Sequence, residues 1–78
     1  MKIEVLGTGC SKCTALLEAT KKAVAQKGMF VQIDKVEDIM QIVAYGVTST
    51  PALVINGKVV SSGKLLGVDE IVAFLDAL

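Results

Sequence analysis

The dipeptide Asn56-Gly57 constrains the fold of this chain more than any other feature. It stands between two apolar runs rich in β-branched residues, 52–55 and 58–61. Asparagine and glycine accept the positive φ angles of a two-residue type I′ turn, which joins antiparallel strands. The sequence therefore predicts a β-hairpin, whose strands are antiparallel to each other.

Strands and helices alternate in the rest of the chain. Short β-rich runs predict two further strands, over residues 2–6 and 30–36. Apolar positions at helical spacing predict three helices, over residues 11–27, 37–45 and 68–78. We expect the apolar helix positions and the two phenylalanines to form the core: Leu16, Leu17, Val24, Ile39, Ile42, Val43, Ile71, Val72, Leu75, Phe30 and Phe74.

The predicted order β-α-β-α-β-β-α fixes the fold class. A βαβ unit crosses over right-handed and makes its two strands parallel, whereas the hairpin adds antiparallel strands. The sequence therefore predicts an α/β fold with a four-stranded mixed sheet and helices on both faces. We expect one domain over residues 1–78, with a core supplied by the 53% apolar content.

Charge and hydropathy exclude several functions. Eight lysines balance eight acidic residues, and the chain has no arginine and no histidine. No basic patch is predicted for nucleic acid or an anionic membrane. No apolar run approaches the roughly 20 residues of a membrane span, and the residues after Met1 do not resemble a signal peptide. We expect a cytoplasmic monomer.

Cys10 and Cys13 are the only cysteines, and they stand at the start of the predicted helix 11–27. In a helix this spacing places both on one face, with Cβ atoms about 5–6 Å apart, so that a disulfide can close and reopen. The ring is small, and loop entropy gives it only about 2 kcal/mol of stabilisation. In a reducing compartment a CxxC is more often catalytic or metal-binding than structural.

The position of each cysteine predicts its role. Cys10 lies at the helix start, where unpaired N–H groups and the helix dipole stabilise a thiolate, and Lys12 adds positive charge nearby. In CxxC motifs such surroundings lower the pKa of the attacking thiol to roughly 3.5–7.5. Cys13 lies one turn further, on the stripe that faces the sheet. We predict that Cys10 is the nucleophile and that Cys13 resolves the mixed disulfide.

Two motifs carry a resemblance to a known family. One is the CxxC at a strand-to-helix junction; the other is Thr50-Pro51 directly before residues 52–55, with Tyr45-Gly46 six and five residues before the proline. Together they resemble the thioredoxin/glutaredoxin superfamily over the whole chain, and most closely the small redox-active disulfide proteins of archaea and bacteria. The resemblance implies a thioredoxin-like fold of glutaredoxin size.

The same resemblance implies a function and a substrate groove. Cys10 and Cys13 would form a redox-active disulfide that needs no other cofactor, reduces disulfide-containing target proteins and is re-reduced by a thioredoxin-reductase-like flavoprotein. Pro51 would be cis beside the disulfide, with the backbone of Thr50 presented to an extended substrate and Gly63 lining the same groove. The other substrate-binding residues assigned to this groove are Gly9, Ser11, Lys12 and Ser62.

Glu4 has two interpretations, and both stay open. It lies six residues before Cys10, where thioredoxins keep a buried aspartate. A carboxyl group beneath the disulfide would take the proton from Cys13 during release of the target. The alternative is a structural glutamate near the solvated start of a strand. The lysine that partners the aspartate in thioredoxins is missing, and Gln32 occupies its place when residues are counted back from Pro51.

A metal carrier is the main alternative. Residues 7–13 also resemble the loop of heavy-metal-associated domains, which bind Cu(I) through two thiolates. Those domains run βαββαβ, so the helix predicted at 37–45 argues against them. Two cysteines without histidine are also an incomplete ligand set for zinc, and we predict no metal. A binding module with an incidental CxxC is the other alternative.

Overall fold

The computed structural model describes residues 1–8 and 11–77. Its elements are β1 (Lys2–Leu6), α1 (Ser11–Gln26), β2 (Gln32–Val36), α2 (Ile39–Ala44), β3 (Ala52–Ile55), β4 (Lys58–Ser62) and α3 (Val68–Asp76). The order is the predicted one, and the boundaries differ by no more than two residues, as helix and strand ends commonly do. In the part of the chain that is described, no helix has the length and apolar content of a membrane span.

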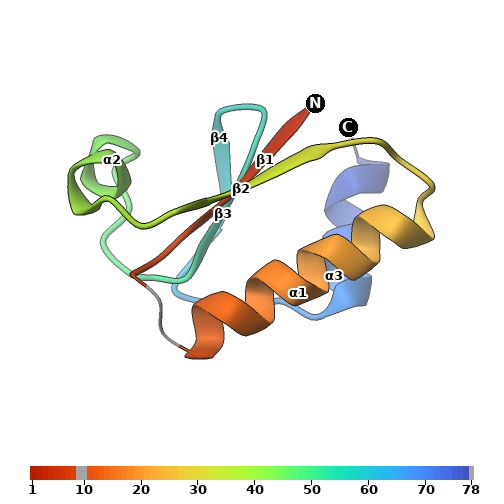
Figure 1. The fold of residues 1–78 in the computed structure, drawn as a ribbon, viewed down its shortest axis with the longest axis horizontal. Coiled ribbons are helices and arrows are strands. Elements are labelled where there is room, and N and C mark those ends of the chain that lie inside the picture. The colour runs from red at the N-terminus through yellow and green to blue at the C-terminus, as the bar shows by residue number, and fades with distance from the viewer. Residues whose placement is uncertain (9–10, 78) are drawn as a thin grey trace.

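The four strands form one mixed sheet in the order β2-β1-β3-β4. β1 runs parallel to β2 and antiparallel to β3, and β4 closes the hairpin against β3. Figure 1 shows α1 and α3 together on one side of the sheet and α2 on the other. The predicted α/β fold with a mixed sheet is therefore confirmed. The helix α2 between β2 and β3 departs from the βαββαβ order of metal-carrying domains.

The hairpin turn has the backbone that its sequence predicts. Asn56 and Gly57 have φ angles of 52° and 80°, both in the left-handed region that a type I′ turn requires. The turn is also tied to the start of β1, because the N–H of Lys2 donates to Asn56 Oδ1 at 3.1 Å. The Asn56 N–H in turn donates to the Lys2 carbonyl at 2.9 Å. These bonds align β3 beside β1.

The core lies on both faces of the sheet. The residues of β1 alternate, so Ile3 and Val5 face α1 and α3, whereas Leu6 faces α2. The larger cluster, under α1 and α3, contains Ile3, Val5, Leu16, Ala23, Val24, Leu53, Ile55, Leu66, Ile71 and Leu75. The smaller cluster, under α2, contains Leu6, Val36, Ile42, Val47, Ala52 and Val54.

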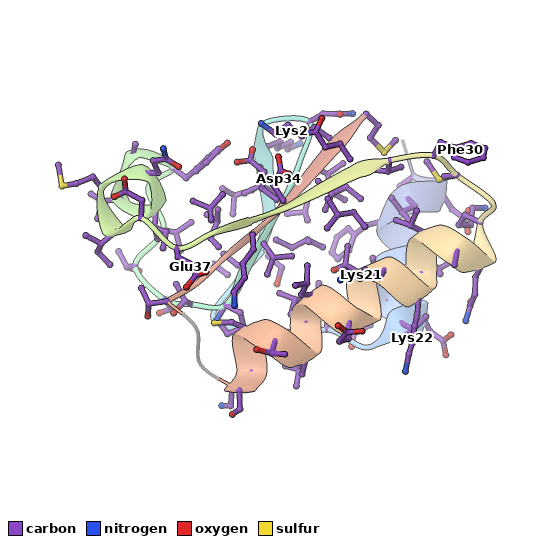
Figure 2. The ribbon with its side chains drawn as sticks, in the orientation of Figure 1. Lys2, Lys21, Lys22, Phe30, Asp34 and Glu37 are labelled. Atoms are coloured by element: carbon purple, nitrogen blue, oxygen red, sulfur yellow. The ribbon has the colours of Figure 1, made fainter. Side chains whose placement is uncertain are left out.

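Three residues predicted for the core are exposed instead. Ile39 and Val43 on α2 keep 57% and 61% of their surface exposed, and Phe30 is fully exposed at 103%. α2 has only six residues, and Ile42 is its buried residue, so one position covers the sheet where the pattern predicted three. Phe30 lies in the connection after α1, where Figure 2 shows its ring pointing away from the sheet. The prediction was wrong for these side chains.

Candidate active site

Cys13 and the Thr50-Pro51 pair, both among the predicted site residues, lie where β1 ends, α1 begins and β3 starts. Cys13 lies in the first turn of α1 and is fully buried, with 0% of its surface exposed. Ser11 and Lys12, assigned to substrate binding, are exposed on the same turn. The predicted nucleophile Cys10 and its neighbour Gly9 lie outside the described residues, so their assignments stay predictions.

Gly7 makes room for the thiol of Cys13. The residue follows β1 directly, and its N–H donates to the Val36 carbonyl at 2.9 Å, which continues the pairing with β2. A Cβ atom on Gly7 would stand 2.2 Å from Sγ of Cys13 and 3.0 Å from its Cβ. The thiol therefore fills space that any other residue's Cβ would occupy. Sequence analysis missed this role, although a glycine at the end of a buried strand often marks such a close approach.

Thr50 and Pro51 approach the same point from the start of β3. The peptide bond between them is cis, Pro51 is buried and Thr50 is exposed. A Cβ atom added to Gly7, at the position next to the Cys13 thiol, would stand 4.0 Å from Cβ of Thr50. The structure thus brings together Cys13 and the Thr50-Pro51 pair, which are far apart in the sequence.

Gly63 contacts Pro51 and the segment that precedes it. Its N–H donates to the Pro51 carbonyl at 2.9 Å, and its φ angle of 70° favours glycine. A Cβ on Gly63 would stand 2.8 Å from Cβ of Ser49, so the loop passes close to the end of β4. Ser62 pairs with Ala52 beside it. Gly63 and Ser62 therefore lie next to the Thr50-Pro51 segment, and their part in substrate binding stays a prediction.

Glu4 lies on the α2 side of the sheet. It shares the face of β1 that carries Leu6, whereas Cys13 belongs to α1 on the other face. Its carboxylate accepts a hydrogen bond of 2.5 Å from the hydroxyl of Tyr45, which follows α2. The bond ties the end of α2 to the centre of the sheet. Whether Glu4 also accepts a proton from Cys13 stays a prediction.

Gln32 does not substitute for a lysine beside Glu4. The strand register places Asp34 opposite Glu4 and Gln32 opposite Lys2. The Gln32 amide donates to Asp34 at 2.9 Å, and Lys2 lies 3.7 Å from the same carboxylate. The residue that contacts Glu4 comes from the end of α2 instead, a pairing across 41 positions that no local pattern signals.

We expect Tyr45 to ionise above its ordinary pKa of 10.0, because the bond to Glu4, then burial and the carboxylate charge, raise its pKa. The stabilisation from this bond is complete below pH 10 and is lost as the pH rises through the raised pKa. The chain has one tyrosine and no tryptophan, so phenolate absorbance measures this pKa directly. Glu4→Gln should move the midpoint down towards 10. The same midpoint in both proteins would contradict the assignment.

Comparison with known proteins places this arrangement in a family. A family model described as a thioredoxin domain matches residues 1–76. The chain is 32% identical over 71 residues to a thioredoxin from Methanothermobacter thermautotrophicus, covering 91% of this chain and 92% of that protein. It is 39% identical over 69 residues to a thioredoxin from Methanocaldococcus jannaschii, covering 88% of this chain and 79% of that protein.

Proposed function

Since this chain belongs to the thioredoxin family and is a thiol–disulfide oxidoreductase, we propose that Cys10 and Cys13 carry electrons to disulfides of target proteins. The observation that supports this proposal is the burial of the Cys13 thiol against Gly7, beside Thr50 and Pro51. A thiol in that position is shielded from outside disulfides. It suits a resolving cysteine, which needs to reach only its neighbour at the helix start.

The proposed reaction has two exchange steps. The Cys10 thiolate attacks one sulfur of the target disulfide and forms a mixed disulfide with it, the target S–S bond breaks, and the other target sulfur leaves as a thiolate that takes up a proton. The Cys13 thiol then loses its proton and attacks the Cys10 sulfur. This step forms the Cys10–Cys13 disulfide and releases the second target thiol. Two electrons pass from the pair to the target, and Glu4 is the candidate acceptor for the Cys13 proton.

The cycle closes when a reductase returns two electrons to the Cys10–Cys13 disulfide. Members of the family act on disulfide-bearing targets and depend on a reductase in general. We propose a thioredoxin-reductase-like flavoprotein as that partner and the cytoplasm as the place of action. The pair is the redox group, and no further cofactor enters these steps.

A redox titration tests the proposal. The protein is equilibrated in dithiothreitol buffers of graded potential, its thiols are alkylated, and the two states are separated by mass. We expect a single two-electron transition near the thioredoxin value of about −270 mV. A midpoint far above the cytosolic glutathione potential, roughly −220 to −320 mV, would instead make the protein an oxidant or isomerase. Failure to form the intramolecular disulfide at any potential would refute the proposal.

A further inference from the structure

The helix α2 contacts the sheet through one buried residue. It has six residues, and Ile42 is the one that is buried, whereas Ile39, Met40 and Val43 are exposed. Figure 1 shows α2 at one end of the sheet, away from α1 and α3. A helix this short is not stable by itself and depends on its contacts with the rest of the fold. Any further bond between this end of the molecule and the sheet therefore decides how firmly α2 is held.

The hydrogen bond from Tyr45 to Glu4 is such a bond. Glu4 lies on β1, which is paired with β2 on one side and β3 on the other, so its backbone is fixed. Asp34, its neighbour on β2, has Lys2 and Gln32 as partners. In the part of the chain that the structure describes, the Tyr45 hydroxyl is the one side-chain partner of the Glu4 carboxylate. Its length of 2.5 Å lies at the short end of the range for a hydroxyl that donates to a carboxylate.

Tyr45 also begins the segment that leads to the site. Residues 46–50 connect it to Pro51, and within them Val47 is buried in the smaller core cluster. At the far end, the N–H of Gly63 donates to the Pro51 carbonyl at 2.9 Å. The segment 46–50 is therefore held at one end by the bond between Tyr45 and the central strand, and at the other end by β4. A short segment held at both ends passes on a displacement of either end.

We propose that Tyr45 and Glu4 are positioning residues, whose hydrogen bond fixes the segment 46–50 and so holds Thr50 ready for a protein target. A segment that is ordered before binding loses less conformational entropy when the target binds. The inference rests on the proposed function, because it assumes that targets bring their disulfides to the CxxC beside Thr50. This role of Glu4 is separate from acceptance of the Cys13 proton, since the bond acts through the position of the chain.

Tyr45→Phe tests the inference, because it removes the hydroxyl and keeps the ring, which packs against the smaller core cluster. The pre-reduced protein is mixed with insulin or with hydroxyethyl disulfide, at concentrations where the rate is proportional to the disulfide and so reports the attack by Cys10. We expect the insulin rate constant to fall roughly three- to tenfold, the cost of ordering one or two more side chains on binding. The hydroxyethyl disulfide rate constant should not change, because this small molecule reacts without contacting a long stretch of the protein.

Amide hydrogen exchange over residues 46–50 measures the positioning itself. We expect these amides to exchange faster in Tyr45→Phe than in the wild type, with exchange in α1 and β3 unchanged. Glu4→Leu should speed exchange in the same segment, and Tyr45→Phe/Glu4→Leu should exchange no faster than either single variant, because the same bond is lost in all three. Glu4→Gln keeps an oxygen that accepts from the Tyr45 hydroxyl, so it should restore most of the slow exchange.

Gln32→Ala is the matched control, because it removes another side-chain bond to a carboxylate, between two residues of β2. Both rate constants and the exchange of residues 46–50 should stay as in the wild type.

Two results would overturn the inference: an insulin rate constant that Tyr45→Phe leaves unchanged, or one that falls no more than the rate constant for hydroxyethyl disulfide. Additive effects of Tyr45→Phe and Glu4→Leu on exchange would also overturn it. If pre-reduced wild-type protein does not reduce hydroxyethyl disulfide, the proposed function fails. If it reduces both substrates and Tyr45→Phe changes neither rate, only the positioning role is refuted.

Discussion

Cys10→Ser is expected to abolish disulfide reduction, by roughly 10³-fold or more, because a serine hydroxyl stays protonated where a thiolate must attack. Cys13→Ser should act differently. It leaves the attacking thiol in place and removes the thiol that releases the target, so the target should remain attached to Cys10. Incubation with a disulfide-bonded target followed by mass analysis measures both effects.

The expected adduct is the Cys13→Ser protein plus the target chain attached through one sulfur, and dithiothreitol should remove it. The double variant Cys10→Ser/Cys13→Ser is the control and should form no adduct. Full activity in Cys10→Ser would refute the assigned nucleophile. An adduct on Cys13 in the Cys10→Ser protein, formed as fast as on Cys10 in the reciprocal variant, would show that burial of Cys13 does not protect it from targets.

The sheet could be predicted from the sequence because its signals are local. Asn56-Gly57 sets the hairpin through its own backbone preference, and a βαβ unit has one favoured handedness. The exposure of Ile39 and Val43 could not be predicted in this way. Periodicity shows which positions of a helix are apolar, but it does not show that a six-residue helix covers the sheet with Ile42 alone.

Some residues of the candidate site could be named from the sequence because short motifs contain them. Cys13 and Thr50-Pro51 were named from the sequence, and the structure brings them to one place. The contacts that support them were not predicted, because each depends on approach in space. Tyr45 reaches Glu4 across the sheet, and the need for glycine at position 7 follows only from where α1 places the Cys13 thiol.

Gly7→Ala is expected to displace the resolving thiol. The added Cβ would stand 2.2 Å from Sγ of Cys13, far inside van der Waals contact. Gly7 is held by its N–H bond to the Val36 carbonyl, so Cys13 must yield or this end of β1 must move. Overpacking of this kind costs about 1–3 kcal/mol, which lowers the melting temperature of a chain this size by roughly 5–20 °C.

The displaced thiol should also react faster, and this effect separates positioning from simple loss of stability. In a Cys10→Ser background, where Cys13 is the only cysteine left, alkylation under native conditions measures how well its thiol is covered. We expect Gly7→Ala to raise that rate well above the rate of the parent, and to shift the Cys10–Cys13 midpoint in the otherwise unchanged chain. The shift follows because the potential depends on how the fold holds each sulfur.

Gly67→Ala is the matched control. Gly67 precedes α3, its φ angle of −78° suits any residue, and an added Cβ would meet nothing closer than Glu70 Oε1 at 3.8 Å. It should cost a few tenths of a kcal/mol to about 1 kcal/mol as a changed N-cap, with no change in Cys13 alkylation or midpoint. Gly7 also lacks a positive φ angle, so alanine causes no backbone strain at either position. The difference between the two variants therefore measures the steric contact between position 7 and the Cys13 thiol. If Gly7→Ala matched Gly67→Ala in stability, alkylation rate and midpoint, the Cys13 thiol would not depend on the space beside Gly7.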